Sequence, residues 1–156
     1  MKISEAGIDM IKEFEGFREE PYPDIAGHMT VGYGHMIKHG EMCDSITEEK
    51  ATELLGTDLL NAECVVNTHV AADLNQNQFD ALVSFVFNIG AGLKGVKDGF
   101  VTLRSGNQST LLKTLNMGDF ESAAAQFLFW DHAGGVEVDG LRDRRMKEMH
   151  LFSAAV

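Results

Sequence analysis

The chain has 156 residues, 44% of them apolar, and its 24 acidic residues against 13 Lys and Arg give a net charge of −11. This composition excludes disordered, collagen-like and low-complexity proteins, and a chain of this length folds without stabilising metals or disulfides. Residues 1–60 hold 13 acids and 5 Lys or Arg, net −8, whereas residues 61–156 hold 11 and 8, net −3. So acidic a chain is a poor partner for nucleic acid.

The first twenty residues carry eight charged side chains after Lys2 and lack the apolar run of a signal peptide or membrane anchor. We therefore expect a protein made in the cytosol, with no membrane anchor. The two cysteines, Cys43 and Cys64, match no zinc-binding spacing, so two free thiols are expected, with a single disulfide as the alternative.

The predicted elements follow one another without repeats or Pro-rich linkers. Apolar residues at helical spacing predict a helix from Ser4 to Glu15, which Gly16 ends. Gly, Pro and Asp punctuation over 17–39, with an alternating segment at 28–35, predicts a small antiparallel sheet. Further helices are predicted over about 47–67, 75–89, 109–115, 119–130 and 140–154, the second of these so apolar that it must be buried. The fold class is therefore α+β, mainly α.

Three polar residues stand close together near the predicted sheet: Glu15 at the end of the first helix, Asp24 in a Tyr-Pro-Asp turn, and Thr30 on a strand. Taken singly, each has an ordinary structural explanation as a solvated acid, a turn former and a β-branched strand residue. The whole string Glu15-Gly-Phe-Arg-Glu-Glu-Pro-Tyr-Pro-Asp-Ile-Ala-Gly-His-Met-Thr-Val-Gly-Tyr-Gly-His35 resembles the active-site segment of phage-type lysozymes, glycoside hydrolase family 24.

This resemblance continues in residues 78–90, 109–118 and 140–148 and so covers nearly the whole chain. It implies a single lysozyme-like domain with a substrate cleft between two lobes. The sheet-bearing lobe, about residues 12–50, would carry the catalytic groups. The helical lobe would comprise residues 68–156 and the first helix, and the helix at about 47–67 would join the two.

The resemblance implies a phage endolysin, a muramidase that hydrolyses the β-1,4 bond between N-acetylmuramic acid and N-acetylglucosamine, with inversion. Glu15 suits the general acid, because the negative end of a helix dipole disfavours the charged carboxylate, and Asp24 suits the second, ionised carboxylate. The Thr30 hydroxyl would hold a water near Asp24. No cofactor or metal is implied, and the implied substrate contacts are Gly32, Gly34, Met36, Phe87 and Asn88.

The expected partner is then peptidoglycan, and the protein is expected to be a monomer. A separate holin-type membrane permeabiliser, which forms no stable complex with it, would release the protein from the host cytoplasm to the wall. Two alternatives stay open at this point. A lytic transglycosylase would use one acid and no positioned water. A non-catalytic peptidoglycan-binding or virion protein would keep the fold without the reaction.

Other features favour structural interpretations. His35 and His39 are four residues apart, but on strand and loop rather than helix, so we expect His35 to pair with Asp58 instead of binding a metal. Trp130 is expected in the core, and core packing is an equal alternative for Phe87.

Two segments of the second half complete the expectations. Arg144, Arg145 and Glu148 are predicted to form ion pairs on the surface of the last helix. Residues 93–108 form a segment that is longer than the family pattern and borders the expected cleft. We expect it to be a surface loop, so that deleting Lys94 to Asn107 leaves folding intact.

Overall fold

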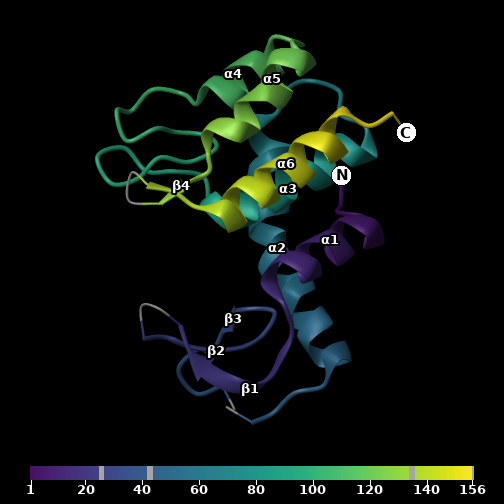
Figure 1. Cartoon of the computed structure of the whole chain (residues 1–156), viewed down its shortest axis with the longest axis vertical. Coiled ribbons are helices and arrows are strands. Elements are labelled where there is room, and N and C mark those ends of the chain that lie inside the picture. Colours follow the sequence, from purple (N-terminus) through teal and green to yellow (C-terminus); the bar gives the residue numbers. More distant parts are fainter. Residues whose placement is uncertain (25–26, 42–43, 134–135, 156) are drawn as a thin grey trace. The chain divides into compact units, whose positions relative to one another are not determined.

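The computed structural model describes residues 1–24, 27–41, 44–133 and 136–155. Helices and short strands follow one another along the chain (Figure 1). The elements are α1 (Glu5–Glu15), β1 (Arg18–Pro23), β2 (Met29–Gly32), β3 (His35–Met36), α2 (Glu48–His69), α3 (Gln76–Ile89), α4 (Thr110–Asn116), α5 (Phe120–Gln126), the 3₁₀ helix η1 (Phe127–Phe129), β4 (His132–Ala133), β5 (Val136–Glu137) and α6 (Asp139–Ser153).

The fold is α+β and mainly helical, which confirms the predicted class. Each predicted helix is present, although the one expected over 119–130 ends as a 3₁₀ turn, and the β4–β5 hairpin was not predicted. The chain divides into two compact units, one formed by Ile8–Leu60 and the other by Met1–Gly7 with Asn61–Val156. Cys43 lies outside the described residues, and Cys64 is an exposed free thiol.

The unit Ile8–Leu60 is built on a three-stranded antiparallel sheet in the order β1-β2-β3. Gly32 ends β2 at a φ of +67°, and a Cβ there would lie only 2.8 Å from the Cβ of Ala51 on α2. Glycine is therefore required for the close approach of this strand to α2. The next residue, Tyr33, is buried and donates a hydrogen bond of 2.7 Å to Glu48, so the turn is fixed to α2 at two successive residues.

The other unit has α3 at its centre, lying beside α6 (Figure 1). Asn75 caps α3 in a reciprocal capping box with Gln78, which satisfies two backbone N–H groups at its start. Its residues Phe79–Val86 are all buried, as the apolar pattern predicted. The ring of Phe85 meets those of Phe127 and Trp130 edge-on, at centroid distances of 5.0 and 5.6 Å.

The start of α1 is anchored to α3 through Asp80, a carboxylate that is 2% exposed. Its Oδ1 accepts from the Ser4 backbone N–H at 3.0 Å, and its Oδ2 accepts from Ser4 Oγ. Gly7 faces the same carboxylate so closely that a Cβ there would lie 2.8 Å from Asp80 Cγ. Ser4 Oγ in turn accepts from the Gly7 N–H at 3.1 Å, so the N-terminal turn of α1 is capped by a residue that the buried Asp80 holds to the helical unit.

Two predictions about this unit are wrong. Arg144, Arg145 and Glu148 form ion pairs, but in the core rather than on the helix surface, with exposed fractions of 5%, 0% and 0%. The segment 93–108 is more than a surface loop, because Phe100 within it is fully buried and packs edge-on against Phe85. Both errors arise because α3 supplies contacts that local sequence does not reveal.

Candidate active site

Glu15 is the last residue of α1, and its side chain is exposed. The helix ends there because Gly16 adopts a φ of +68°, a conformation that favours glycine, while its N–H still bonds to Lys12. Oε2 of Glu15 points to the turn between β2 and β3, since a Cβ built on Gly34 would lie 3.9 Å from it. Gly34 thus brings its backbone near the carboxylate without adding a side chain there.

Asp24 follows directly after β1 and closes the loop that leads to β2. Its backbone N–H donates to the His28 carbonyl at 2.8 Å, and its Oδ1 accepts from the His28 N–H at 2.8 Å. Oδ2 lies 3.4 Å from Nδ1 of His28, and 36% of the side chain is exposed. The His28 N–H therefore orients one carboxylate oxygen while the group stays accessible to water.

Thr30 lies opposite Tyr22 in the β1–β2 register and opposite Met36 in the β2–β3 register. The residue is 5% exposed, and its hydroxyl donates to the Tyr22 carbonyl at 3.1 Å. This bond orients the hydroxyl, whose oxygen can still accept a hydrogen bond. Thr30 and Asp24 thus belong to the same hairpin, formed by β1 and β2.

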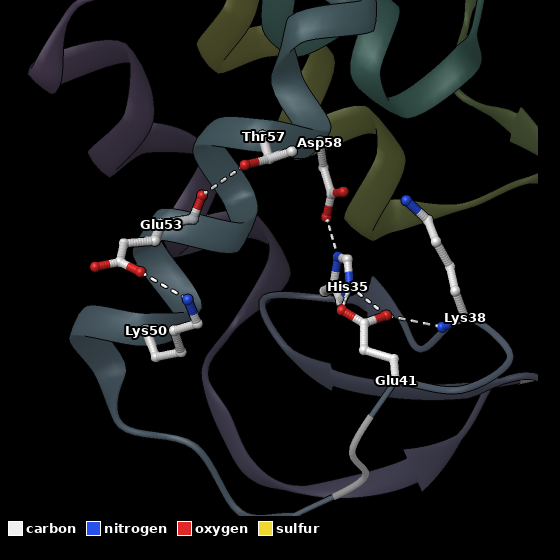
Figure 2. Close-up of polar contacts among 7 residues, drawn as sticks. All are labelled: His35, Lys38, Glu41, Lys50, Glu53, Thr57 and Asp58. Carbon is white, nitrogen blue, oxygen red and sulfur yellow. Dashed lines mark hydrogen bonds and ion pairs between the residues drawn. The ribbon is translucent and has the colours of Figure 1, made fainter.

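His35, the first residue of β3, fixes the β2–β3 hairpin to α2 (Figure 2). Its Nδ1 lies 2.8 Å from Asp58 Oδ2, which confirms the predicted pair, and its Nε2 lies 3.4 Å from Glu41. The Lys38 backbone N–H, with a smaller contribution from His35, holds the pKa of the Glu41 carboxyl below its ordinary value. The imidazole is buried between two carboxylates and so positions the β2–β3 turn.

Tyr33, in that turn, was not singled out from the sequence. Burial, together with the hydrogen bond to Glu48, raises its pKa to about 12. The Lys12 ammonium also lies 5.6 Å from the centre of its ring, and Phe17 packs against the ring at 5.7 Å. Tyr33 therefore links α1, the turn and α2 within the unit that carries Glu15.

The implied substrate residues of this unit differ in exposure. Gly34 and Met36 are exposed, and Met36 is open over 53% of its surface. Gly32 is buried against Ala51, which gives it a packing role in this structure.

Phe87 and Asn88 belong to the other compact unit, near the C-terminal end of α3. Phe87 is half-buried and Asn88 is exposed. The side chain of Asn88 is oriented by Arg145, whose Nη2 donates to its Oδ1. The sequence offered no signal for this contact, because the two residues are 57 positions apart.

The described residues offer neither a metal site nor a membrane-spanning helix. No group of three or more His, Cys, Asp or Glu residues is arranged to hold a metal ion there. Among the described helices, none combines the length and the apolar character needed to cross a membrane.

Comparison with known proteins gives a consistent result. The family model described as phage lysozyme matches residues 12–148. The endolysin of Bacillus phage B103 is 42% identical over 97% of this chain, which spans only 54% of that relative's length. The endolysin of Acyrthosiphon pisum secondary endosymbiont phage 1 is 40% identical over 99% of this chain and 100% of its own. A crystal structure of a P22 lysozyme mutant has a TM-score of 0.82 at 39% identity, over 99% of both chains.

Proposed function

The chain belongs to the phage lysozyme family, and from that membership we propose that it is an endolysin that hydrolyses the β-1,4 bond between N-acetylmuramic acid and N-acetylglucosamine in peptidoglycan. The observation that carries the proposal is the placement of two carboxylates in one compact unit. Glu15 ends α1 beside the Gly34 turn, and Asp24 follows β1, which pairs with the strand that carries Thr30.

Glu15 is the proposed general acid, which donates its proton to the leaving glycosidic oxygen. The lack of a side chain at Gly34 supports this role, because it leaves room for a sugar next to Oε2. Asp24 is the proposed second carboxylate, which stabilises the oxocarbenium-like state or activates water. Its 36% exposure and its fixed Oδ1 suit a group that stays ionised and meets water.

Thr30 is the proposed water-positioning residue. Its hydroxyl hydrogen is taken by the Tyr22 carbonyl, so its oxygen would accept a hydrogen bond from the attacking water. Attack by a water held there gives inversion at the anomeric carbon, and the carboxyls of inverting enzymes lie about 6.5–9.5 Å apart. Analysis of the product anomer by NMR tests this part, and a retained anomer would contradict it.

The test of the acid assignment is Glu15→Gln, which fits the same space but cannot donate the proton. Release of reducing ends from purified peptidoglycan should fall by about 10²-fold or more with folding unchanged. The matched control is Asp9→Asn, which removes one charge from a 73% exposed side chain of the same helix. Activity of Glu15→Gln above a tenth of wild type would overturn the assignment.

The second and third roles are tested in the same assay. Asp24→Asn should cripple turnover, and Thr30→Val should lower it while keeping the shape of the strand residue. Controls at Glu19 and Glu20, two exposed acids on β1, should keep wild-type rates when changed to Gln. If a control loses activity and Asp24→Asn does not, the second carboxylate is one of those two residues.

The products separate the proposal from its alternatives. A hydrolase releases reducing ends, whereas a lytic transglycosylase releases anhydro-muropeptides, which mass spectrometry distinguishes. A non-catalytic wall-binding protein would sediment with walls and release neither.

The proposal also covers the oligomeric state of the protein and its route to the wall. We expect a monomer that meets peptidoglycan only after a separate holin-type permeabiliser opens the membrane. Expression of the protein alone should then lyse cells only after chloroform treatment. Spontaneous lysis, or a dimer in size-exclusion chromatography, would contradict these points.

A further inference from the structure

The amide of Asn88 meets a side chain that has only donors. The guanidinium group of Arg145 carries five N–H donors and no acceptor, so the amide must present its oxygen to it. Burial lowers the pKa of Arg145 to about 10, against the opposing effect of Glu148, and the group therefore stays protonated at neutral pH. Consequently the amide is held with Oδ1 toward Arg145, and its Nδ2 donor is left for a ligand.

This orientation is enforced by the burial of Arg145, which is fully inaccessible to solvent. Within the described part of the chain, Asn88 Oδ1 is the one hydrogen-bond acceptor that the structure gives its guanidinium group. Glu148 lies 2.9 Å from Nη1 as an ion pair, outside hydrogen-bond geometry, and the ring of Phe85 lies 4.8 Å from Cζ. Turning the amide over would place two donors together and leave a buried donor unsatisfied, which is costly.

Asn88 also borders a cavity of about 990 Å³ whose walls all come from the helical unit. Ile89, Trp130 and Leu141 supply apolar surface to the walls of the same cavity. An acetamido group needs this combination: a donor for its carbonyl oxygen and an apolar surface for its methyl group. A hydroxyl in its place would forgo the methyl contact.

We propose that Arg145 is a positioning residue that holds the Asn88 amide so that its Nδ2 donates to the acetamido carbonyl of an N-acetylated sugar, with the methyl group in the adjoining cavity. The proposal rests on the proposed function, since it specifies which substituent of the glycan this unit recognises. Arg145 itself touches no substrate and acts through the orientation of the Asn88 amide.

Binding of two uncharged tetrasaccharides tests the proposal without relying on catalysis. Chitotetraose and cellotetraose share the β-1,4-linked glucose backbone and differ at C2, where one has acetamido groups and the other hydroxyls. Isothermal titration calorimetry with the wild-type chain should show chitotetraose binding at least tenfold tighter. Equal affinities would overturn the proposal but would leave the hydrolase assignment to the reducing-end assay.

Asn88→Asp is the decisive variant, because a carboxylate still pairs with Arg145 but has no donor. Its melting temperature should equal or exceed that of wild type, while its affinity for chitotetraose falls by about 3- to 10-fold, the effect of one lost hydrogen bond. Affinity for cellotetraose should change far less. Gln126→Glu is the matched control, since it makes the same chemical change on another wall of the same cavity.

A preference that persists in Asn88→Asp, or an equal loss in Gln126→Glu, would overturn the proposal. Arg145→Gln then tests the positioning role, because glutamine offers both donor and acceptor and frees the Asn88 amide to turn. Its preference for chitotetraose should fall toward that of Asn88→Asp, and an unchanged preference would remove Arg145 from the proposal. If Arg145→Gln does not fold, the Asn88→Asp and Gln126→Glu variants still test whether Asn88 contacts the acetamido group.

Discussion

Replacing Glu148 by alanine should destabilise the protein far more than the loss of any surface ion pair. The Glu148 carboxylate accepts from Ser84 Oγ at 2.7 Å, and it lies 3.2 Å from Arg144 Nε and 2.9 Å from Arg145 Nη1. Both arginine side chains are almost completely buried, at 6% and 0% exposed, so neither can turn to water once the acid is gone.

Removing one partner of such a buried pair costs about 3–5 kcal/mol, because a desolvated charge is left without compensation. Total stabilities of domains are about 5–15 kcal/mol, so this loss is a large fraction of the whole. For a chain of this size it corresponds to a fall in melting temperature of roughly 6–20 °C. Urea unfolding followed by far-ultraviolet circular dichroism measures the change directly.

The control is Glu137→Ala, which removes an acid paired with an arginine of the same last helix. That acid lies 2.7 Å from Arg142, but the two side chains are 47% and 58% exposed, so solvent screens the pair and its loss should change the midpoint little. The double change Arg145→Met with Glu148→Leu should recover much of the loss, because an apolar pair needs no compensation. A loss below about 1 kcal/mol for Glu148→Ala would refute the reasoning from burial.

Two further predictions concern single side chains. Gly7→Ala should lower the free energy of unfolding by about 1–3 kcal/mol, since the new Cβ would lie 2.8 Å from Asp80 Cγ. Gly56→Ala should raise it by about 0.5–1 kcal/mol, because nothing lies within 4 Å of a Cβ built there. If urea unfolding gave the same change in the free energy of unfolding for both variants, the argument from the space around each glycine would be wrong. The raised pKa of Tyr33, about 12, means that folding favours its protonated form, so this contribution to stability is present below pH 10 and is lost as the pH rises toward 12. The absorbance change on tyrosine ionisation, taken as the stopped-flow difference between wild type and Tyr33→Phe, should have its midpoint near pH 12. A midpoint near pH 10 would refute the burial argument.

Local residue patterns were enough to predict the helical elements, the family and the grouping of the proposed catalytic residues. Glu15, Asp24 and Thr30 lie within sixteen consecutive residues, and a helix end, a turn and a hairpin are local structures whose residue types can be read directly. The pair of His35 with Asp58 was also predictable, because a histidine at a strand end needs a partner and the next helix offers acids.

Tertiary structure alone decided which charged residues of α6 are buried. Arg144, Arg145 and Glu148 have the spacing of surface ion pairs, and contacts with distant residues, among them Ser84 and Asn88 on α3, accompany their burial in the core. Helical periodicity records which residues share a face, but not what covers that face.

The same reason explains the segment 93–108 and the orientation of Asn88. Phe100 stands among glycines and charged residues, so its neighbours predict a surface loop, yet the ring of Phe85 on α3 gives it a buried site. Asn88 has no local partner, and the buried guanidinium group that turns its amide comes from 57 residues away. Contacts between distant segments decide burial because the free energy of desolvation depends on what surrounds a group in space, not along the chain.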